Sequence, residues 1–223
     1  MRINKAFGTM ALVTLLLYGC SGNLASQGTS LEPIIAEKGA SIGKTYTITL
    51  RLVNIERNRQ GAYLRLFDEK YNTIFVYVSK ENRNKVANLV RNSTYIYKFK
   101  ITKNDQYTTL SAALNDVADE KGKPISGKLK DPKPGALLIK LDGSEAVGKE
   151  FSLPLNFKNV KEENGRKIFV GETVDDYRND IFLSCPDALE EKIGGLKSSD
   201  KITVKFKVDK VETHISGSLL SIE

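Results

Sequence analysis

The feature that most constrains this fold is an internal repeat: residues 43–55, GKTYTITLRLVNI, return 105 positions later as residues 148–160, GKEFSLPLNFKNV. In both copies every second residue is apolar, which is the spacing of a strand that buries one face. The last apolar residue of each copy, Ile55 or Val160, falls out of this phase. The repeat therefore predicts two related strands that share a bulge or a sharp bend.

Each copy continues through the same series of predicted elements. Alternating or β-rich runs predict strands, and a change to helical spacing predicts one short helix. The first copy has predicted strands at 43–55, 62–68 and 73–79, a helix at 80–91, and strands at 95–101 and 107–114. The second copy has predicted strands at 148–160, 167–174 and 180–185, a helix at 187–196, and strands at 201–208 and 214–222.

Three strands, a helix and two further strands are the element order of the OB fold, a five-stranded, partly open barrel. Each copy of the repeat resembles this fold along its whole length. We therefore predict a mainly β protein with two tandem OB-fold-like five-stranded barrels, each with a short helix between strands 3 and 4. A lipocalin-like barrel of eight to ten strands is the alternative. The internal repeat and the helix within each copy argue against it.

The N-terminus has the layout of a bacterial secretory signal. Two basic residues precede an apolar run at 11–18, which is shorter than the roughly 20 residues of a permanent membrane helix. The run ends at Leu17-Tyr18-Gly19-Cys20, which resembles the lipobox of bacterial lipoproteins. The resemblance implies that Cys20 becomes the lipidated N-terminus, carrying fatty acyl chains such as palmitate. Because Ser21 rather than Asp follows, it also implies an anchor in the outer membrane, on a periplasmic or surface face that stays open. An ordinary cleaved signal with an incidental cysteine is the alternative.

These features divide the chain into five predicted parts. Residues 1–19 are the signal peptide, 20–40 the lipid-anchored tether, 41–115 the first barrel, 116–135 a linker and 136–223 the second barrel. The tether is rich in Gly, Ser and Ala, and the linker has three prolines and several lysines. Both compositions are typical of connecting segments.

Charge separates the two copies. Residues 41–115 carry 13 Lys/Arg against 5 Asp/Glu, a net charge of +8, whereas residues 145–223 carry 12 against 15, a net charge of −3. A basic first domain favours an anionic partner. Attraction between the two domains is an equally good explanation of the same charges.

The predicted strands 2 and 3 of the first barrel place aromatic and basic side chains on the outward face. OB folds bind ligands on these strands, and aromatic rings flanked by arginine stack on bases or sugar rings. The predicted ligand-binding residues are Tyr63, Arg65, Phe75, Tyr77, Lys98 and Lys100. In the second barrel the corresponding outward residues are expected to be Phe169, Gly171, Phe182 and Ser184, a poorer site. Packing between the two domains is the alternative role for these rings.

The sequence contains few candidates for catalysis. Ser41 lies in a G-x-S-x-G pattern, but a nucleophile elbow needs a strand before the serine and a helix after it, and the predicted order here is a loop and then a strand. Cys185 is followed by acidic residues, which favours a buried, inert thiol. No zinc-ligand spacing and no phosphate-binding loop occurs. We therefore expect no catalytic residue, no metal and no cofactor.

These observations predict a non-enzymatic envelope lipoprotein that binds a partner through its OB-like domains. The expected partners are the membrane, through the lipid on Cys20, and a protein, a glycan or an anionic surface in the envelope. A nucleic-acid-binding OB-fold protein and a secreted enzyme with an unrecognised site are the alternatives. The compartment disfavours nucleic acid, because an exported protein meets little of it.

Overall fold

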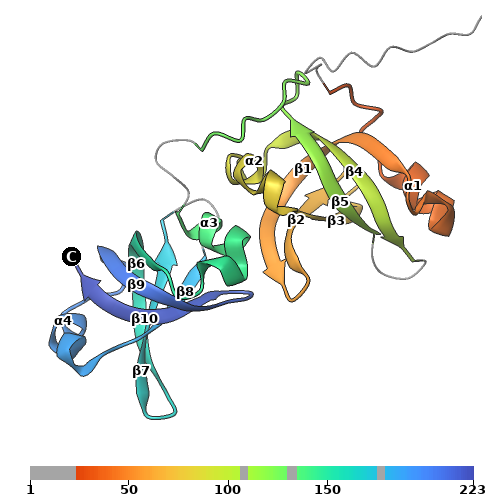
Figure 1. The fold of residues 1–223 in the computed structure, drawn as a ribbon. Coiled ribbons are helices and arrows are strands. Elements are labelled where there is room, and N and C mark those ends of the chain that lie inside the picture. The colour runs from red at the N-terminus through yellow and green to blue at the C-terminus, as the bar shows by residue number, and fades with distance from the viewer. Residues whose placement is uncertain (1–23, 106–109, 130–134, 175–178) are drawn as a thin grey trace, which may run out of the picture.

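The protein is described here from a computed structural model, which covers residues 24–105, 110–129, 135–174 and 179–223. The described chain folds into two closed five-stranded barrels in tandem, with strand orders β1-β2-β3-β5-β4 and β10-β8-β7-β6-β9 (Figure 1). The predicted OB-like architecture is confirmed, and the lipocalin-like alternative is wrong because each barrel closes with five strands. The predicted signal peptide and Cys20 lie outside the described residues.

The first repeat begins with two short helices and continues through its barrel. The helices are α1 (Glu32–Glu37) and η1 (Lys38–Ser41). The strands are β1 (Thr45–Asn58), β2 (Gly61–Phe67), β3 (Thr73–Tyr77), β4 (Thr94–Asn104) and β5 (Leu110–Ala118), and η2 (Lys80–Asn82) and α2 (Arg83–Ala87) lie between β3 and β4. The helix predicted between the third and fourth strands is therefore confirmed.

The second repeat has the same elements in the same order. The helices α3 (Gly135–Asp142) and η3 (Gly143–Ala146) precede its barrel. The barrel contains β6 (Glu150–Glu163), β7 (Arg166–Thr173), β8 (Asp180–Ser184), η4 (Asp187–Leu189), α4 (Glu190–Gly194), β9 (Lys201–Val211) and β10 (Ile215–Ile222). Equivalent positions are 105 residues apart as far as β7 and 107 apart from β8, because the segment between β7 and β8 is two residues longer than its counterpart.

In each barrel one long strand pairs with two neighbouring strands. The first half of β1 pairs with β4 and the second half with β2, with an irregularity between Leu52 and Asn54. The irregularity in β6, between Phe157 and Asn159, falls at the equivalent positions. The bulge predicted from the out-of-phase residues is confirmed, and it lets one strand bend around the barrel. Parallel pairing of β3 with β5, and of β8 with β10, closes the two barrels.

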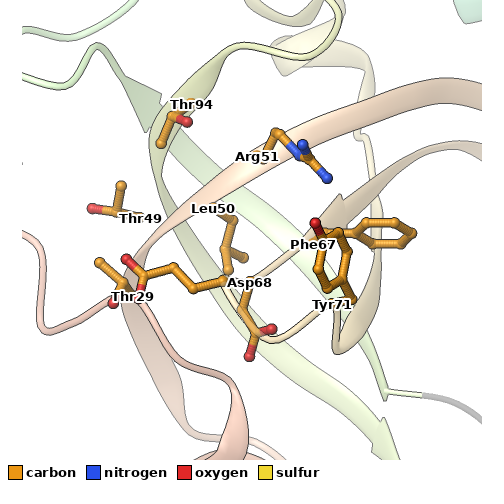
Figure 2. A pocket seen from close by; sticks show the side chains of 9 residues that line it. Thr29, Thr49, Leu50, Arg51, Phe67, Asp68, Tyr71 and Thr94 are labelled. Atoms are coloured by element: carbon orange, nitrogen blue, oxygen red, sulfur yellow. The ribbon is translucent and has the colours of Figure 1, made fainter.

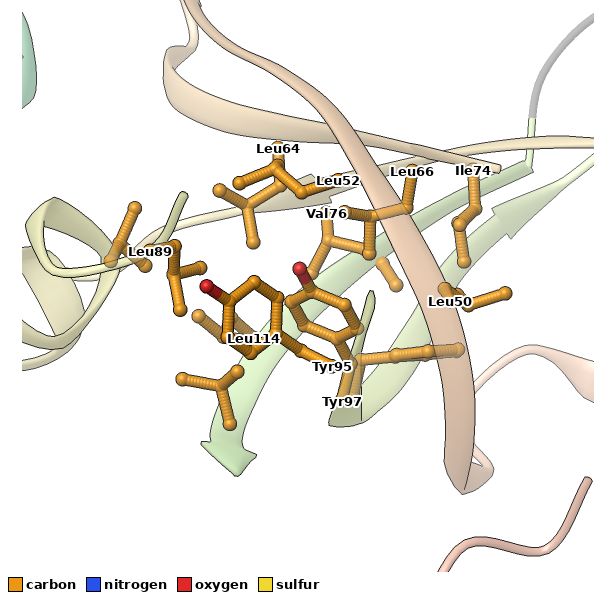
Figure 3. Packing of buried hydrophobic residues seen from close by; sticks show 14 of the residues in the cluster. Leu50, Leu52, Leu64, Leu66, Ile74, Val76, Leu89, Tyr95, Tyr97 and Leu114 are labelled. Carbon is orange, nitrogen blue, oxygen red and sulfur yellow. The ribbon is translucent and has the colours of Figure 1, made fainter. Parts of the chain in front are cut away.

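The inward faces of the strands form a separate core in each barrel. Figure 3 shows the buried side chains of the first barrel, among them Leu50 and Leu52 of β1, Leu64 and Leu66 of β2, and Ile74 and Val76 of β3. These residues are at most 1% exposed. The second core is built from the equivalent strands, with Phe169 and Phe206 completely buried. The period of two in the sequence therefore identified the core faces of β1 to β4 and of β6, but not that of β7.

Each repeat begins with helices that the sequence did not predict. Leu31 and Ile34, in the segment predicted as a tether, are buried in the first core. The side-chain amide of Asn104 holds α1 and η1 against the end of β4, donating to the carbonyl oxygens of Ile34 at 2.7 Å and Lys38 at 3.0 Å. A six-residue helix carries too little periodicity to be recognised in sequence, and packing on the barrel end stabilises it.

The predicted linker also differs, because part of it packs on the first barrel. Ile125 and Leu129 contact the first core. The amide of Asn88 donates to the carbonyl oxygens of Ser126 and Lys128, both at 2.8 Å. These contacts extend the first folded unit beyond the end of β5.

Helix α3 lies between the two barrels (Figure 1). Leu137 and Leu141 belong to the first core, while Ala136 and Ile139 belong to the second. One eight-residue helix therefore contributes one apolar face to each barrel and joins the two repeats. Among the described residues, no helix has the length and apolar composition needed to cross a membrane.

Candidate functional site

Strands β1, β2 and β3 form one continuous outward surface on the first barrel. The strand register places Tyr63 opposite Tyr77 and Arg65 opposite Phe75. Each of these four side chains is half-buried, and their inward neighbours are core residues. The structure therefore brings together four of the six residues predicted to bind a ligand.

The rings on this surface are held in place by contacts with one another. The ring centroid of Tyr63 lies 5.6 Å from that of Phe75, edge to face, and 5.7 Å from that of Tyr77. The hydroxyl of Tyr77 donates to the side chain of Gln60, and it accepts a hydrogen bond from the amide of Asn58. Such restraint lowers the conformational entropy lost when a ligand stacks on the rings.

Glu56 is the acidic residue that contacts both Tyr63 and Arg65. Its carboxylate lies 3.3 Å from the guanidinium of Arg65 and accepts a hydrogen bond of 2.7 Å from the hydroxyl of Tyr63. Burial, reinforced by this hydrogen bond, raises the pKa of Tyr63 to about 12. Tyr63 therefore stays a neutral hydrogen-bond donor at physiological pH.

Three further residues extend this surface toward the turn between β2 and β3. Arg51 of β1 pairs in register with Phe67, and its guanidinium lies 5.6 Å from the ring centroid of Tyr71. The rings of Phe67 and Tyr71 are 6.2 Å apart, edge to face. A pocket of about 250 Å³ opens beside them, and Figure 2 shows the Arg51 side chain directed toward both rings. Tyr71 is 68% exposed.

We call this set the aromatic surface. It comprises Tyr63, Phe67, Tyr71, Phe75, Tyr77, Arg51 and Arg65. The ligand-binding residues predicted from the sequence did not include Arg51, Phe67 or Tyr71. The alternation in β1 does predict that Arg51 points outward, but only the register past the bulge shows that it lies beside Phe67.

Lys98 and Lys100 do not join the aromatic surface. Both are exposed on β4, where they pair with Thr47 and Thr45 in the first half of β1. Arg65 pairs with Asn54, seven positions further along β1 than Thr47. At the rise of a strand this separation is on the order of 20 Å. The two lysines contribute long-range charge rather than contacts.

The aromatic surface is distinct from the contact between the barrels. Helix α3 meets the first barrel at Arg57 and at Arg83 of α2. The hydrogen bonds and ring contacts of Tyr63 and Tyr77 are with side chains of the first barrel itself.

The equivalent surface of the second barrel has a different composition. Ile168, Val170 and Glu172 replace Tyr63, Arg65 and Phe67, and Asn156 replaces Arg51. The expectation that Phe169 and Gly171 face outward is wrong. Phe169 is completely buried, and a side chain at Gly171 would meet Leu155 and Phe169. The phase of β7 follows its core partner in β6, which its short sequence did not reveal. Phe182 does contact surface side chains, with Lys161 5.5 Å from its ring centroid.

Ser41 and Cys185, the two residues considered for catalysis, are both withdrawn from solvent to some degree. Ser41 is completely buried; its hydroxyl donates to the carbonyl oxygen of Lys38 at 2.8 Å and accepts from Asn104 at 2.9 Å. Cys185 is half-buried, and burial raises the pKa of its thiol, which favours the neutral form. Within the described ranges, no group of three or more His, Cys, Asp or Glu side chains is placed to hold a metal ion.

This chain is similar in structure to several solved proteins. No family model matches this chain, and no curated protein sequence is similar to it. The single-stranded DNA binding protein from Thermus aquaticus is similar over 82% of this chain and 93% of its own, at 11% identity and a TM-score of 0.29. The Ifi202 HINa domain in complex with 20 bp double-stranded DNA is similar over 82% of this chain and 96% of its own, at 11% identity and a TM-score of 0.28. Fission yeast Pot1 with single-stranded DNA is similar over 84% of this chain and 86% of its own, at 10% identity and a TM-score of 0.25.

These matches correct one expectation. Nucleic acid was expected to be a disfavoured partner, and the matches run against that expectation: the structures named above are of a single-stranded DNA binding protein and of two proteins with DNA. The matches identify no binding residue in this chain.

Proposed function

We propose that this protein is a non-enzymatic binding module that holds single-stranded nucleic acid on the aromatic surface of its first barrel. The observation that carries the proposal is the gathering of five aromatic rings and two arginines on one outward face. Flat rings stack on unpaired bases, and cations on the same face attract the phosphates. Stacking needs unstacked bases, so a single strand fits this surface better than a duplex.

The arrangement of the rings suits a strand of several nucleotides. Tyr63, Phe75 and Tyr77 form one contact cluster, and Phe67 and Tyr71 form a second one. Each stacked base contributes roughly 1–3 kcal/mol to binding. Two separate clusters on one surface support contact with at least two bases.

The arginines give this surface its affinity for phosphate. Among the described residues, Arg51 forms no ion pair with an acidic side chain, and its guanidinium is oriented by Tyr71. The guanidinium of Arg65, by contrast, forms an ion pair with Glu56. Asp68 and Glu69 line the same pocket as Arg51, but no ion pair joins either of them to its guanidinium. Arg51 is therefore the stronger candidate for a direct phosphate contact.

We further propose that the lipid on Cys20 holds this module on a bacterial membrane, most simply the outer membrane. The support is the resemblance of Leu17-Tyr18-Gly19-Cys20 to a lipobox. The nucleic acid bound would then be one met outside the cytoplasm.

Fluorescence anisotropy with labelled 12-nucleotide dT and mixed-sequence strands tests the binding proposal, using the chain without its first 20 residues. With two or three phosphates contacted, the affinity should fall with salt with a log–log slope of about −1.4 to −2. A matching duplex should bind more weakly. Binding that does not depend on salt would instead favour stacking on a neutral ligand such as a glycan, and absence of binding at low salt would refute the proposal.

The internal repeat supplies a matched control. Phe75 and Phe182 are equivalent residues on the two barrels. Phe75→Ala should weaken binding by about 5- to 150-fold, the equivalent of losing one stacked base. Phe182→Ala should leave binding unchanged. Equal losses in both variants would place the site elsewhere.

A further inference from the structure

The first barrel carries a helix-docking site at the end where α2 lies. Ile55, Ala62, Val86 and Ala87 line this end, and each is at most 6% exposed. Helix α3 covers them by placing Leu137 and Leu141 in the first core. Helix α3 therefore packs on an apolar end of the barrel through two leucines at positions i and i+4.

Charged residues fix the orientation of α3 at this site. Arg57 donates to the carbonyl oxygens of Lys140 and Leu141 at the C-terminal end of α3. Just beyond, Arg83 lies 3.3 Å from both Asp142 and Glu145, and Lys80 lies 3.1 Å from Glu145. A basic rim on the barrel thus meets an acidic end on the helix.

The second barrel has the same end, and it is open. The equivalents of Ile55, Ala62 and Ala87 are Val160, Lys167 and Gly194, which are exposed, and Val160 is 39% exposed. Together with Cys185 and Ile193 they line a pocket of about 200 Å³. A second pocket, of about 430 Å³, adjoins it on the side of Pro186 and Leu219.

The rim of the open site has acidic residues at the positions that are basic on the first barrel, and Arg166 and Lys167 line the same pocket. Glu162 stands where the first barrel has Arg57, Asp187 where it has Lys80, and Glu190 where it has Arg83. All three acidic residues line the second pocket. The inversion occurs at each of the three positions that orient α3 on the first barrel.

We propose that this open end of the second barrel, formed by β6, β7 and α4, docks an amphipathic helix of a partner protein. The helix would present two leucines at i and i+4 to the pocket and basic residues at its C-terminal end, in the places of Asp142 and Glu145. Charge complementarity selects this occupant, because the acidic residues would repel Asp142 and Glu145 of a copy of α3 and attract basic side chains in their places. Glu162 cannot donate to the terminal carbonyl oxygens as Arg57 does, so its partner is a basic side chain of the helix.

Within the described ranges, a second copy of this chain has no suitable helix free. The available helix is α1, in which Glu32 and Ala36 occupy the positions of Leu137 and Leu141. The exposed carboxylates of Glu32 and Glu37 would also face the acidic rim. Head-to-tail stacking of identical chains is therefore disfavoured at this site.

Lys167 covers the open site without blocking it. Its ammonium lies 2.6 Å from the carboxylate of Glu190, across the mouth of the pocket, and its side chain is 51% exposed. Exposed ion pairs of this kind contribute little to stability. A basic residue of the partner can replace Lys167 beside Glu190 while the lysine side chain swings aside.

A helical peptide tests the proposal. The probe is the sequence of residues 135–146 with Asp142→Lys and Glu145→Lys. It also carries Gly135→Lys and Ile139→Glu, whose side chains lie opposite the two leucines and are joined as a lactam to hold the peptide helical. The chain without its first 20 residues contains Cys185 as its single thiol, and this thiol lines the pocket. The peptide should protect Cys185 from iodoacetamide in a saturable way, and should bind at least about tenfold tighter than the unreversed peptide.

Two matched variants decide the outcome. Val160→Asp places a charge in the pocket, and Val174→Asp places one at an exposed valine at the opposite end of β7. To keep the measurement independent of Cys185, both are compared by anisotropy of the labelled peptide. Val160→Asp should weaken peptide binding about tenfold or more and Val174→Asp should not change it. Equal binding of the two peptides, or equal binding to the two folded variants, would overturn the proposal.

Discussion

The guanidinium of Arg57 donates a hydrogen bond of 3.1 Å to the main-chain carbonyl oxygen of Lys140. The donor belongs to β1 of the first barrel and the acceptor to the end of α3, which begins the second repeat. Helix C-terminal carbonyls carry partial negative charge, so a cation there is favourable. Burial lowers the pKa of Arg57, as does the nearby charge of Arg83. The contact with the helix offsets part of this desolvation.

Arg57→Met should weaken the association of the two repeats. A hydrogen bond from a charged donor contributes about 1.5–3 kcal/mol, so the free energy of unfolding should fall by roughly that amount. Urea unfolding followed by circular dichroism measures the change. Arg59→Met, two residues away in the turn between β1 and β2, is the control and should change stability little. Equal effects of both substitutions would contradict a specific role for Arg57.

Replacing both Leu137 and Leu141 by alanine should uncouple the two barrels. These side chains are at most 1% exposed, and a buried leucine replaced by alanine costs about 2–5 kcal/mol. Because the losses fall on the first core, this barrel should unfold at a lower denaturant concentration than the second. Calorimetry should then resolve two transitions. Val147→Ala, at a residue that is 45% exposed, is the control. A single unshifted transition in the double variant would show that α3 does not couple the barrels.

Arg51→Ala should reduce both nucleic-acid affinity and its salt dependence. Loss of one phosphate contact lowers the magnitude of the salt slope for a single strand by about 0.7. Lys98→Ala removes an equal charge whose β1 partner, Thr47, lies about 13 Å along the strand from Arg51. It should leave the slope unchanged, with a small decrease in association rate. Anisotropy titrations at several salt concentrations compare the two. An identical slope change in both variants would argue for a diffuse electrostatic surface.

Asp68→Asn should change the pH dependence of stability. The buried carboxylate of Asp68 accepts hydrogen bonds from the backbone N–H groups of Leu31, Lys70 and Asn72 and from the amide of Asn72. Burial acts to raise the pKa of Asp68, but these hydrogen bonds together hold it below its ordinary value of 3.8. Its contribution is therefore fully present above about pH 4 and is lost as pH falls through the lower folded-state pKa.

The variant should lose about 1–3 kcal/mol at neutral pH, since a donor amide would face donors. Its stability should also fall less steeply than that of the unsubstituted protein between pH 4 and pH 2. Urea midpoints across this range provide the measurement. Parallel pH curves for the two proteins would show that Asp68 does not titrate as described.

Cys20→Ser should abolish lipid attachment. Metabolic labelling with an alkyne fatty acid, followed by membrane fractionation, should show the label and the membrane-bound fraction only in the unsubstituted chain. Cys185→Ser is the control and should keep both. A Cys20→Ser protein that still carries label and sediments with membranes would contradict the lipoprotein hypothesis.

The sequence by itself determined the repeat, the faces of the main strands in the first barrel and the bulge in each long strand. A period of two leaves little freedom, because a slip of one residue would bury a strand's polar face. The alternation therefore identified Leu50, Leu52, Leu64 and Leu66 as core residues. It also placed Tyr63, Arg65, Phe75 and Tyr77 on the outward face, because parity alone fixes which side of a strand a residue occupies.

Tertiary structure decided which outward residues lie together. Lys98 has the same outward parity as Arg65, but β4 pairs with the first half of β1 and β2 with the second half. Parity carries no information about the register between strands, so the separation of these two cations is invisible in the sequence. The same register brings Arg51 beside Phe67 and Tyr71.

Tertiary structure also decided the roles of the short helices. Helix α3 has Leu137 and Leu141 on one face and Ala136 and Ile139 on another, so it is apolar around much of its surface. In sequence this composition predicts burial without naming the partner on either side. A helix of eight residues is too short to be stable alone, and the two barrels that enclose α3 provide the packing that its sequence cannot.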